Sequence, residues 1–155
     1  FCPGFFFFDA VFEHLNHLFV SAFHGFSHFR IITFHLPLAV LDPGDHALLL
    51  DPCYPSHRGG LLLADAQVHS LPLREASGWM PDLDALPLGD WERLGLFVLG
   101  FPHNPTGRVG TQDLLDRAMA RGCRHQLVIA NDNPYVDLAL DGEAPTLLRS
   151  PGWRE

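Results

Sequence analysis

The chain has 155 residues, of which 47% are hydrophobic, enough for one globular domain with a buried core. Its net charge is −8, and its ten basic residues are scattered arginines with no lysine among them. This charge leaves no basic face for nucleic acid or an anionic membrane, so the expected partners are small molecules or proteins. The three cysteines are odd in number and lack C-x-x-C spacing, which predicts a cytoplasmic protein without disulfides or a zinc site.

A change in composition near residue 35 divides the chain into residues 1–34 and residues 35–155. Eleven of the thirteen phenylalanines lie in the first part. Acidic residues, histidines and an arginine interrupt this part, so it contains no apolar run long enough to span a membrane. Four histidines have spacings that bring side chains together on a helix: His14 and His17, then His24 and His28. No cysteine or carboxylate set completes a coordination shell, so partly exposed histidines on a helix are favoured over a metal site.

From residue 35 onwards, short apolar runs alternate with amphipathic segments. A helix ends through residues 38–41, and Pro43 and Gly44 then turn the chain. A second helix begins after Thr111, whose hydroxyl can cap it, and ends near Gly122. The remaining expected elements are strands at residues 47–50, 67–71, 96–100 and 127–130, and a helix at residues 58–66.

This alternation predicts an α/β fold. Strands separated by helices imply right-handed crossovers and a mostly parallel sheet with helices on both faces. Ligands of such sheets bind at the carboxyl ends of the strands. Two polar segments follow predicted strands at this edge: Asn104-Pro105-Thr106-Gly107 and Asp132-Asn133-Pro134-Tyr135.

The carboxylate of Asp132 at a buried strand end requires a cationic or hydrogen-bonding partner. One interpretation is a structural ion pair with another element; Arg124 and His125 precede it in the chain. The other interpretation is a cofactor site. An aspartate can keep the pyridine nitrogen of pyridoxal phosphate protonated, while hydroxyl and amide donors stabilise the phenolate oxygen of the ring. Asp132, Tyr135 and Asn104 supply these three groups.

Three segments resemble, in the same order, the class I and II aminotransferases: Asp51 to His57, Phe101 to Gly107, and Asp132 to Tyr135. The resemblance implies that Asn104 and Tyr135 contact the phenolate oxygen of pyridoxal phosphate and that Asp132 contacts its ring nitrogen. It also implies that Tyr54 stacks on the ring and that His57 contacts Asp132 on the side away from the cofactor. Without the resemblance, Tyr54 would be interpreted as a core residue and His57 as a surface residue.

The resemblance covers residues 35–155 and implies a large-domain portion of a homodimeric enzyme. Such an enzyme transfers an amino group from an amino acid to a 2-oxo acid, and the segments are most similar to diaminopimelate and alanine-type aminotransferases. The resemblance also implies a cis bond between Asn104 and Pro105.

The chain departs from the family pattern in two places. The family has a small-residue phosphate loop just before the position of His35, whereas residues 28–34 contain bulky side chains such as Phe29. The lysine that binds the cofactor covalently in the family follows the Asp-x-x-Tyr motif, and this sequence has no lysine. We therefore expect an internal piece of an aminotransferase large domain that is inactive alone, with residues 1–34 of different origin.

The sequence is also compatible with other functions. The sheet could serve a non-catalytic binding module that docks a partner through the Phe-rich segment. A lyase or a decarboxylase could use the same cofactor-facing residues. A nucleotide-binding sheet is disfavoured because no glycine-rich phosphate motif follows any predicted strand.

Overall fold

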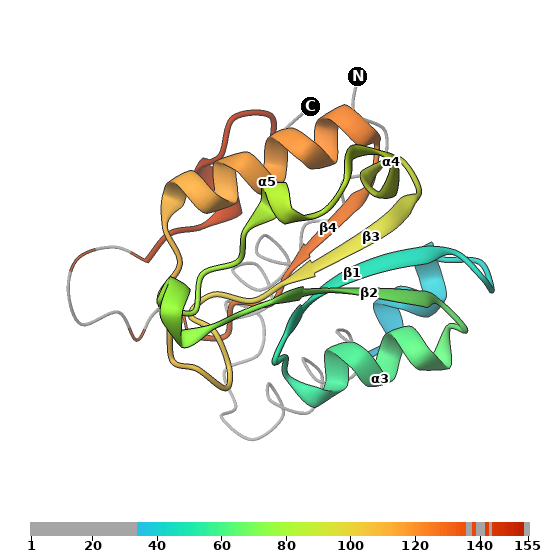
Figure 1. Ribbon diagram of the computed structural model, residues 1–155, viewed down its shortest axis with the longest axis horizontal. Helices are drawn as coiled ribbons and strands as arrows, with labels where there is room; N and C mark the ends of the chain where they lie inside the picture. The colour runs from blue at the N-terminus through green and yellow to red at the C-terminus, as the bar shows by residue number, and fades with distance from the viewer. Residues whose placement is uncertain (1–33, 136–137, 139–141, 143, 154–155) are drawn as a thin grey trace, which may run out of the picture.

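The computed structural model describes residues 34–135, 138, 142 and 144–153. In this part the chain forms a four-stranded parallel sheet with the order β2-β1-β3-β4 (Figure 1). The strands are β1 (His46–Asp51), β2 (Gln67–Pro72), β3 (Leu94–Leu99) and β4 (Val128–Asn131). All four predicted strands are confirmed, with ends that differ by one or two residues. The four spaced histidines and nearly all of the Phe-rich segment, residues 1–33, lie outside the described residues.

Helices cover both faces of the sheet, which confirms the predicted α/β fold class (Figure 1). The helix α5 (Gln112–His125) lies on one face, and α3 (Pro55–Leu63) lies on the other beside a helix at residues 34–40. Between β2 and β3 the chain forms only short helical turns: η1 (Glu75–Ser77), η2 (Leu83–Ala85) and α4 (Leu88–Trp91). A last turn, η4 (Leu147–Arg149), packs against α5.

The helix α3 starts three residues earlier than predicted and also ends three residues earlier. Tyr54 is its N-cap residue with an extended backbone, and Pro55 takes the first helical position, where its missing N–H costs nothing. After the helix, Asp65 adopts a left-handed conformation with φ 55°, which stops the helix short of residue 66.

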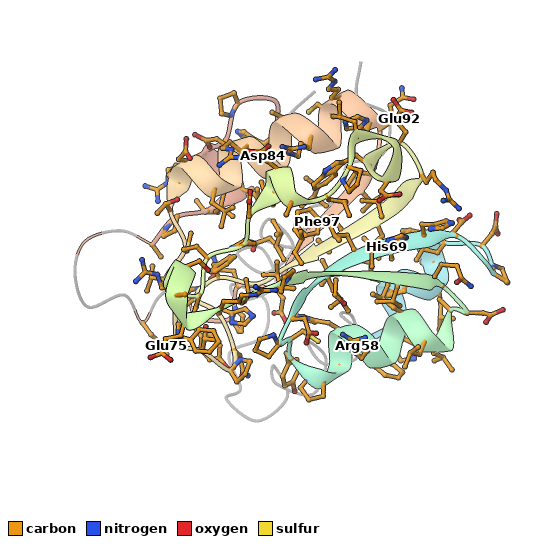
Figure 2. The ribbon with its side chains drawn as sticks, in the orientation of Figure 1. Arg58, His69, Glu75, Asp84, Glu92 and Phe97 are labelled. Carbon is orange, nitrogen blue, oxygen red and sulfur yellow. The ribbon has the colours of Figure 1, made fainter. Side chains whose placement is uncertain are left out.

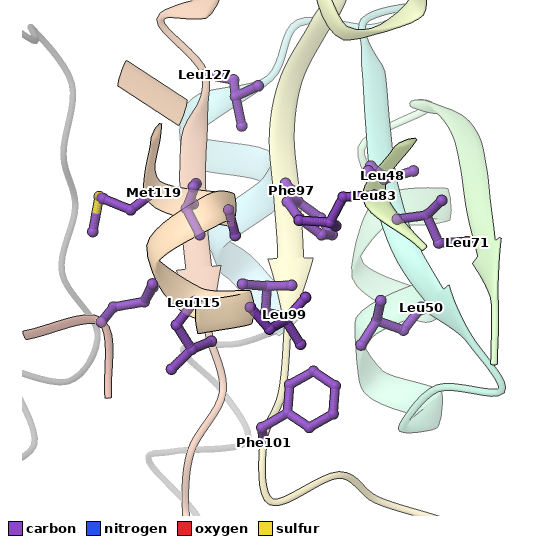
Figure 3. Close-up of a cluster of buried hydrophobic side chains, with 14 of the residues drawn as sticks. Leu48, Leu50, Leu71, Leu83, Phe97, Leu99, Phe101, Leu115, Met119 and Leu127 are labelled. Atoms are coloured by element: carbon purple, nitrogen blue, oxygen red, sulfur yellow. The ribbon is translucent and has the colours of Figure 1, made fainter. Parts of the chain in front are cut away.

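Two hydrophobic clusters lie on opposite faces of the sheet because side chains alternate along each strand. In β1, Leu48 and Leu50 belong to the cluster under α5, whereas Ala47 and Leu49 belong to the cluster under α3. Figure 3 shows the first cluster, in which strand residues pack against α5. Its labelled members include Leu48, Leu71, Phe97, Leu99, Leu115 and Met119. The alternation determines which side chains of each strand face each helix. It therefore also determines the register of the sheet.

Local contacts fix α5 at both ends. The Thr111 side chain accepts a hydrogen bond from the Leu114 N–H at 3.1 Å, as a capping residue should. Near the other end, a Cβ at Gly122 would lie 2.6 Å from the Ile129 Cδ1, so the absent side chain lets Ile129 of β4 pack closely against the helix. Arg117 and Arg121 of the same helix both form ion pairs with Asp84 of η2, and Figure 2 shows Asp84 beside this helix.

The described residues include neither a helix that could cross a bilayer nor a cluster of candidate metal ligands. None of the helices there is both long enough and apolar enough to cross a bilayer. No set of three or more His, Cys, Asp or Glu side chains in the same residues is grouped as metal ligands would be.

Candidate functional site

The loops that follow β1, β3 and β4 meet at the carboxyl edge of the sheet. These three strands are neighbours, so parallel pairing brings their ends to the same place although they are far apart in the sequence. A cavity of about 310 Å³ lies there. The residues lining it include Cys53, Tyr54, His57, Gly100, His103, Asn104, Asp132 and Tyr135.

Asp132 follows β4 directly and is tied to the neighbouring strand by its backbone. Its N–H donates to the Leu99 carbonyl at 2.9 Å, and its side chain is buried, with the residue 7% exposed. The Oδ2 atom lies 2.6 Å from Nε2 of His57, which is itself 7% exposed. His57 is therefore not a surface residue. Arg124 and His125 precede β4 whereas Asp132 follows it, and among the described residues the ion-pair partner of Asp132 is His57.

The second oxygen of the same carboxylate has no partner among the described residues. Oδ1 of Asp132 is buried and accepts no hydrogen bond from any described residue. Burying an acceptor without a donor costs about 1–3 kcal/mol, and more when the group is charged. Asp132 is one of the residues that line the cavity. A ligand with a cationic N–H group, such as a protonated pyridine ring, matches this oxygen in both charge and hydrogen-bonding type.

Gly100, the first residue after β3, permits this arrangement. A Cβ at this position would lie 3.1 Å from the backbone oxygen of Asp132 and 3.6 Å from Cε1 of His57. The missing side chain therefore lets the strand end approach the His57–Asp132 pair. Gly100 was not among the site residues predicted from the sequence, although a glycine at the end of an apolar strand is typical of such a close approach.

Asn104 and Tyr135 lie together on another wall of the cavity. The Asn104 Nδ2 donates to the Tyr135 hydroxyl at 3.4 Å, a long hydrogen bond, and both residues are half-buried. Two amino acids 31 positions apart thus meet because β3 and β4 are adjacent. The bond between Asn104 and Pro105 is cis, as expected.

Tyr54 lines the cavity just before α3. Its ring centroid lies 5.7 Å from that of His57, with the two ring planes at 80°, so the rings meet edge to face. Tyr54 is half-buried and belongs to neither hydrophobic cluster. The position is therefore not a core position, and its ring borders the space beside Asp132.

The structure adds His103, which the sequence analysis did not identify as a site residue. The side chain is buried, with the residue 4% exposed, and it lines the same cavity. Burial lowers the pKa of His103, the nearby His57 lowers it further, and the Pro52 carbonyl raises it in part. The lowered pKa keeps the imidazole neutral at pH 7. One feature of the sequence could have indicated His103: it directly precedes Asn104, which was predicted to be a site residue.

The chain is similar to several known proteins. The family model described as aminotransferase class I and II matches residues 24–150. LL-diaminopimelate aminotransferase from Desulforudis audaxviator is 35% identical over 122 residues, which are 78% of this chain and 31% of that enzyme. The glutamate-pyruvate aminotransferase AlaC of Escherichia coli is 34% identical over 122 residues, 78% of this chain and 30% of that enzyme.

A solved structure shows the same arrangement of elements. It is a probable N-succinyldiaminopimelate aminotransferase from Thermus thermophilus, with a TM-score of 0.75 and 37% sequence identity. The match covers 79% of this chain and 33% of that one. The chain thus spans about a third of the length of the curated relatives that it matches.

Proposed function

Because the chain belongs to the class I and II aminotransferases, we propose that its cavity is part of a pyridoxal-phosphate site. Members of this family depend on pyridoxal phosphate and act on amino acids and oxo acids. The observation that supports the proposal most is Oδ1 of Asp132, which has no partner among the described residues and belongs to a side chain that lines the cavity with Asn104 and Tyr135. The complete protein is proposed to transfer an amino group from an amino acid to a 2-oxo acid.

Each residue of the cavity has a role in this proposal. When bound, pyridoxal phosphate supplies a ring that accepts electrons from the α carbon of an amino acid. Asp132 keeps a proton on the ring nitrogen through Oδ1, and His57 orients the carboxylate through Oδ2. Asn104 and Tyr135 donate hydrogen bonds to the phenolate oxygen. Tyr54 stacks on one face of the ring and excludes water there.

A cofactor held by this chain alone is not bound covalently to a side chain amine, because the sequence contains no lysine. Without a lysine, the chain also lacks the group that moves a proton at the substrate α carbon in the family mechanism. We therefore propose that these 155 residues bind the cofactor weakly and do not transaminate by themselves. Residues 28–33, where the family has its phosphate loop, lie outside the described residues.

The substrates belong to the same proposal. The similar proteins are named for LL-diaminopimelate, N-succinyldiaminopimelate and the glutamate–pyruvate pair, which supports an amino-acid donor and a small 2-oxo acid acceptor. A cytoplasmic homodimer is proposed from family membership. A lyase or a decarboxylase would use the same cofactor-facing residues, so product analysis of the complete protein distinguishes these reactions.

A titration of the purified chain with pyridoxal phosphate tests the binding proposal. We expect saturable binding by calorimetry, which Asp132→Ala weakens at least about tenfold because a charged hydrogen bond is lost. The matched control is Asp84→Ala, which removes an exposed carboxylate outside the cavity and should leave the affinity unchanged. Equal affinities for the two variants would contradict the proposed role of Asp132.

A further inference from the structure

Three side chains form a chain of hydrogen bonds at the amino edge of the sheet, the edge opposite the cavity. His46 is the first residue of β1, His69 lies in β2, and Arg93 directly precedes β3. Nη2 of Arg93 lies 2.8 Å from Nε2 of His46. Nδ1 of His46 lies 2.7 Å from Nε2 of His69. The beginnings of three neighbouring strands are thus linked through side chains.

The arginine determines where the protons of the two neutral imidazoles lie. A guanidinium group donates hydrogen bonds and never accepts them, so Nε2 of His46 is the acceptor and carries no proton. The single proton of the neutral His46 ring is therefore on Nδ1, from which it is donated to Nε2 of His69. His69 in turn carries its proton on Nδ1. Donation runs in one direction, from Arg93 to His46 and from His46 to His69.

One additional proton cannot be added to the histidine pair without breaking a bond in this chain. If His46 holds the proton, both of its nitrogens are donors, and Nε2 no longer accepts from Arg93. If His69 holds it and donates from Nε2, His46 accepts at Nδ1, so the proton of His46 moves to Nε2 and again faces Arg93. In both arrangements the bond between the rings remains, strengthened by the charge.

A third arrangement would keep the bond from Arg93 to His46 and give up the bond between the rings. It places two N–H groups against each other across 2.7 Å, beside a second positive charge on the guanidinium. The two rings are half-buried and their centroids are 5.0 Å apart, whereas Arg93 is exposed and its side chain can turn into solvent. Arg93 is therefore the partner that leaves.

The charged groups around His46 determine when the proton enters. Burial lowers the pKa of His46, and the positive charge of Arg93 and the neighbouring His69 lower it further. Asp45 and Asp90 act in the opposite direction and raise this pKa in part. The proton therefore enters below about pH 6.5, the ordinary value for a histidine.

The bond from Arg93 crosses the sheet where the pairing of β1 with β3 is irregular. His46 pairs with Leu94, but the next residue, Ala47, pairs with Leu96, so the register shifts between these two positions. Such an irregularity interrupts the ladder of backbone hydrogen bonds. A side-chain bond from the residue before β3 to the first residue of β1 reinforces the sheet at this point.

We propose that Arg93, His46 and His69 form a proton-operated latch, in which one proton taken up by the two histidines releases Arg93 and loosens the amino end of β3. The latch lies away from the cavity and does not depend on the cofactor. It makes the beginning of β3 the part of the sheet whose local stability responds to mild acid.

Nitrogen NMR of the purified chain tests the closed latch. At about pH 7.5, well above the ordinary pKa of histidine, both His46 and His69 should carry their proton on Nδ1. Amide hydrogen exchange then tests the release. Protection of residues 94–96, corrected for the intrinsic effect of pH on exchange, should fall about threefold to tenfold as the pair takes up its first proton, as the loss of one hydrogen bond would.

The variant Arg93→Met removes the donor and keeps an unbranched side chain. Coupling between two sites is reciprocal, so if the proton weakens the Arg93 contact threefold to tenfold, removing Arg93 strengthens proton binding by the same factor. The first protonation of the pair should therefore move upwards by about 0.5–1 pH units in this variant. Protection of residues 94–96 should be low throughout the titration. The matched control is Arg124→Met, which removes an exposed arginine of α5 and should titrate as the wild type does.

Three results would overturn the latch. The first is a proton on Nε2 of His46 in the wild-type chain at about pH 7.5. The second is unchanged protection of residues 94–96 while the histidine pair titrates, because Arg93 would then not be released or would not hold β3. The third is an Arg93→Met variant whose histidine pair titrates at the pH of the wild type, because the arginine would then have no influence on the proton.

Discussion

Removing the imidazole of His57 should destabilise the fold, because it leaves the Asp132 carboxylate buried without its partner. In His57→Ala the Asp132 carboxylate stays in place but loses the partner of Oδ2. Oδ1 already has no partner among the described residues, so the variant leaves a buried carboxylate with neither oxygen bonded. The side chains of the pair are only 8% and 6% exposed, so water screens the interaction little.

The size of the effect follows from this burial. Breaking a buried pair by removing one partner costs about 3–5 kcal/mol, because an uncompensated charge remains. Asp132→Asn should cost less, about 1–3 kcal/mol, because the amide carries no charge and still accepts a hydrogen bond. His57→Gln should recover most of the stability, since its amide N–H can reach the position of Nε2. The predicted order, from the most to the least destabilising variant, is therefore His57→Ala, Asp132→Asn and His57→Gln.

Urea unfolding followed by tryptophan fluorescence measures this order, because Trp91 is fully buried and reports on the core. All variants should unfold with the wild-type m-value, which would show that the native state keeps its compactness. A His57→Ala variant within about 1 kcal/mol of wild type would refute the reasoning, since it would mean that Asp132 finds another partner or water at no cost.

Three further perturbations have expected outcomes. Leu48→Ala should lower the free energy of unfolding by about 2–5 kcal/mol in urea titrations, because a fully buried side chain between β1 and α5 is lost. Gly100→Ala should cost about 1–3 kcal/mol by overpacking and should also weaken pyridoxal-phosphate binding measured by calorimetry, because the new methyl group presses on the loop after β4. Burial and the neighbouring Arg93 and His69 lower the pKa of His46, so the unfolded chain binds more protons than the folded one below about pH 6.5. Stability from this group is thus complete above that pH and falls as the pH decreases. Urea titrations at a series of pH values should show that fall for the wild type, and His46→Gln should reduce it.

Much of the fold could be predicted from the sequence because successive side chains of each strand point to opposite faces of the sheet, and both faces are buried. Leu48 and Ala47 point to opposite layers, and the apolar runs that carry this alternation are short and bounded by turns. The start of α3 could not be predicted from apolar periodicity, because its first turn consists of proline, serine, histidine and arginine. The beginning of that helix depends on the N-cap position of Tyr54 and the fixed φ of Pro55.

The candidate site could be predicted in outline for a different reason. Parallel topology places the ends of β1, β3 and β4 side by side, so segments that follow predicted strands were expected at one edge. Gly100 and His103 were missed because their importance comes from contacts across strands. The approach of Gly100 to Asp132 and the burial of His103 beside the cavity exist only after the sheet has formed. No spacing within the chain encodes either of them.

The state of the pyridine nitrogen tests the role of Asp132 most directly. Pyridoxal phosphate labelled with ¹⁵N in the ring, bound to the wild-type chain at neutral pH, should give the NMR shift of a protonated pyridine nitrogen. In the same experiment with Asp132→Ala, bound cofactor should give the shift of the unprotonated ring. An unprotonated nitrogen in the wild-type complex, or a protonated one in both proteins, would contradict the assignment of Asp132 to the cofactor.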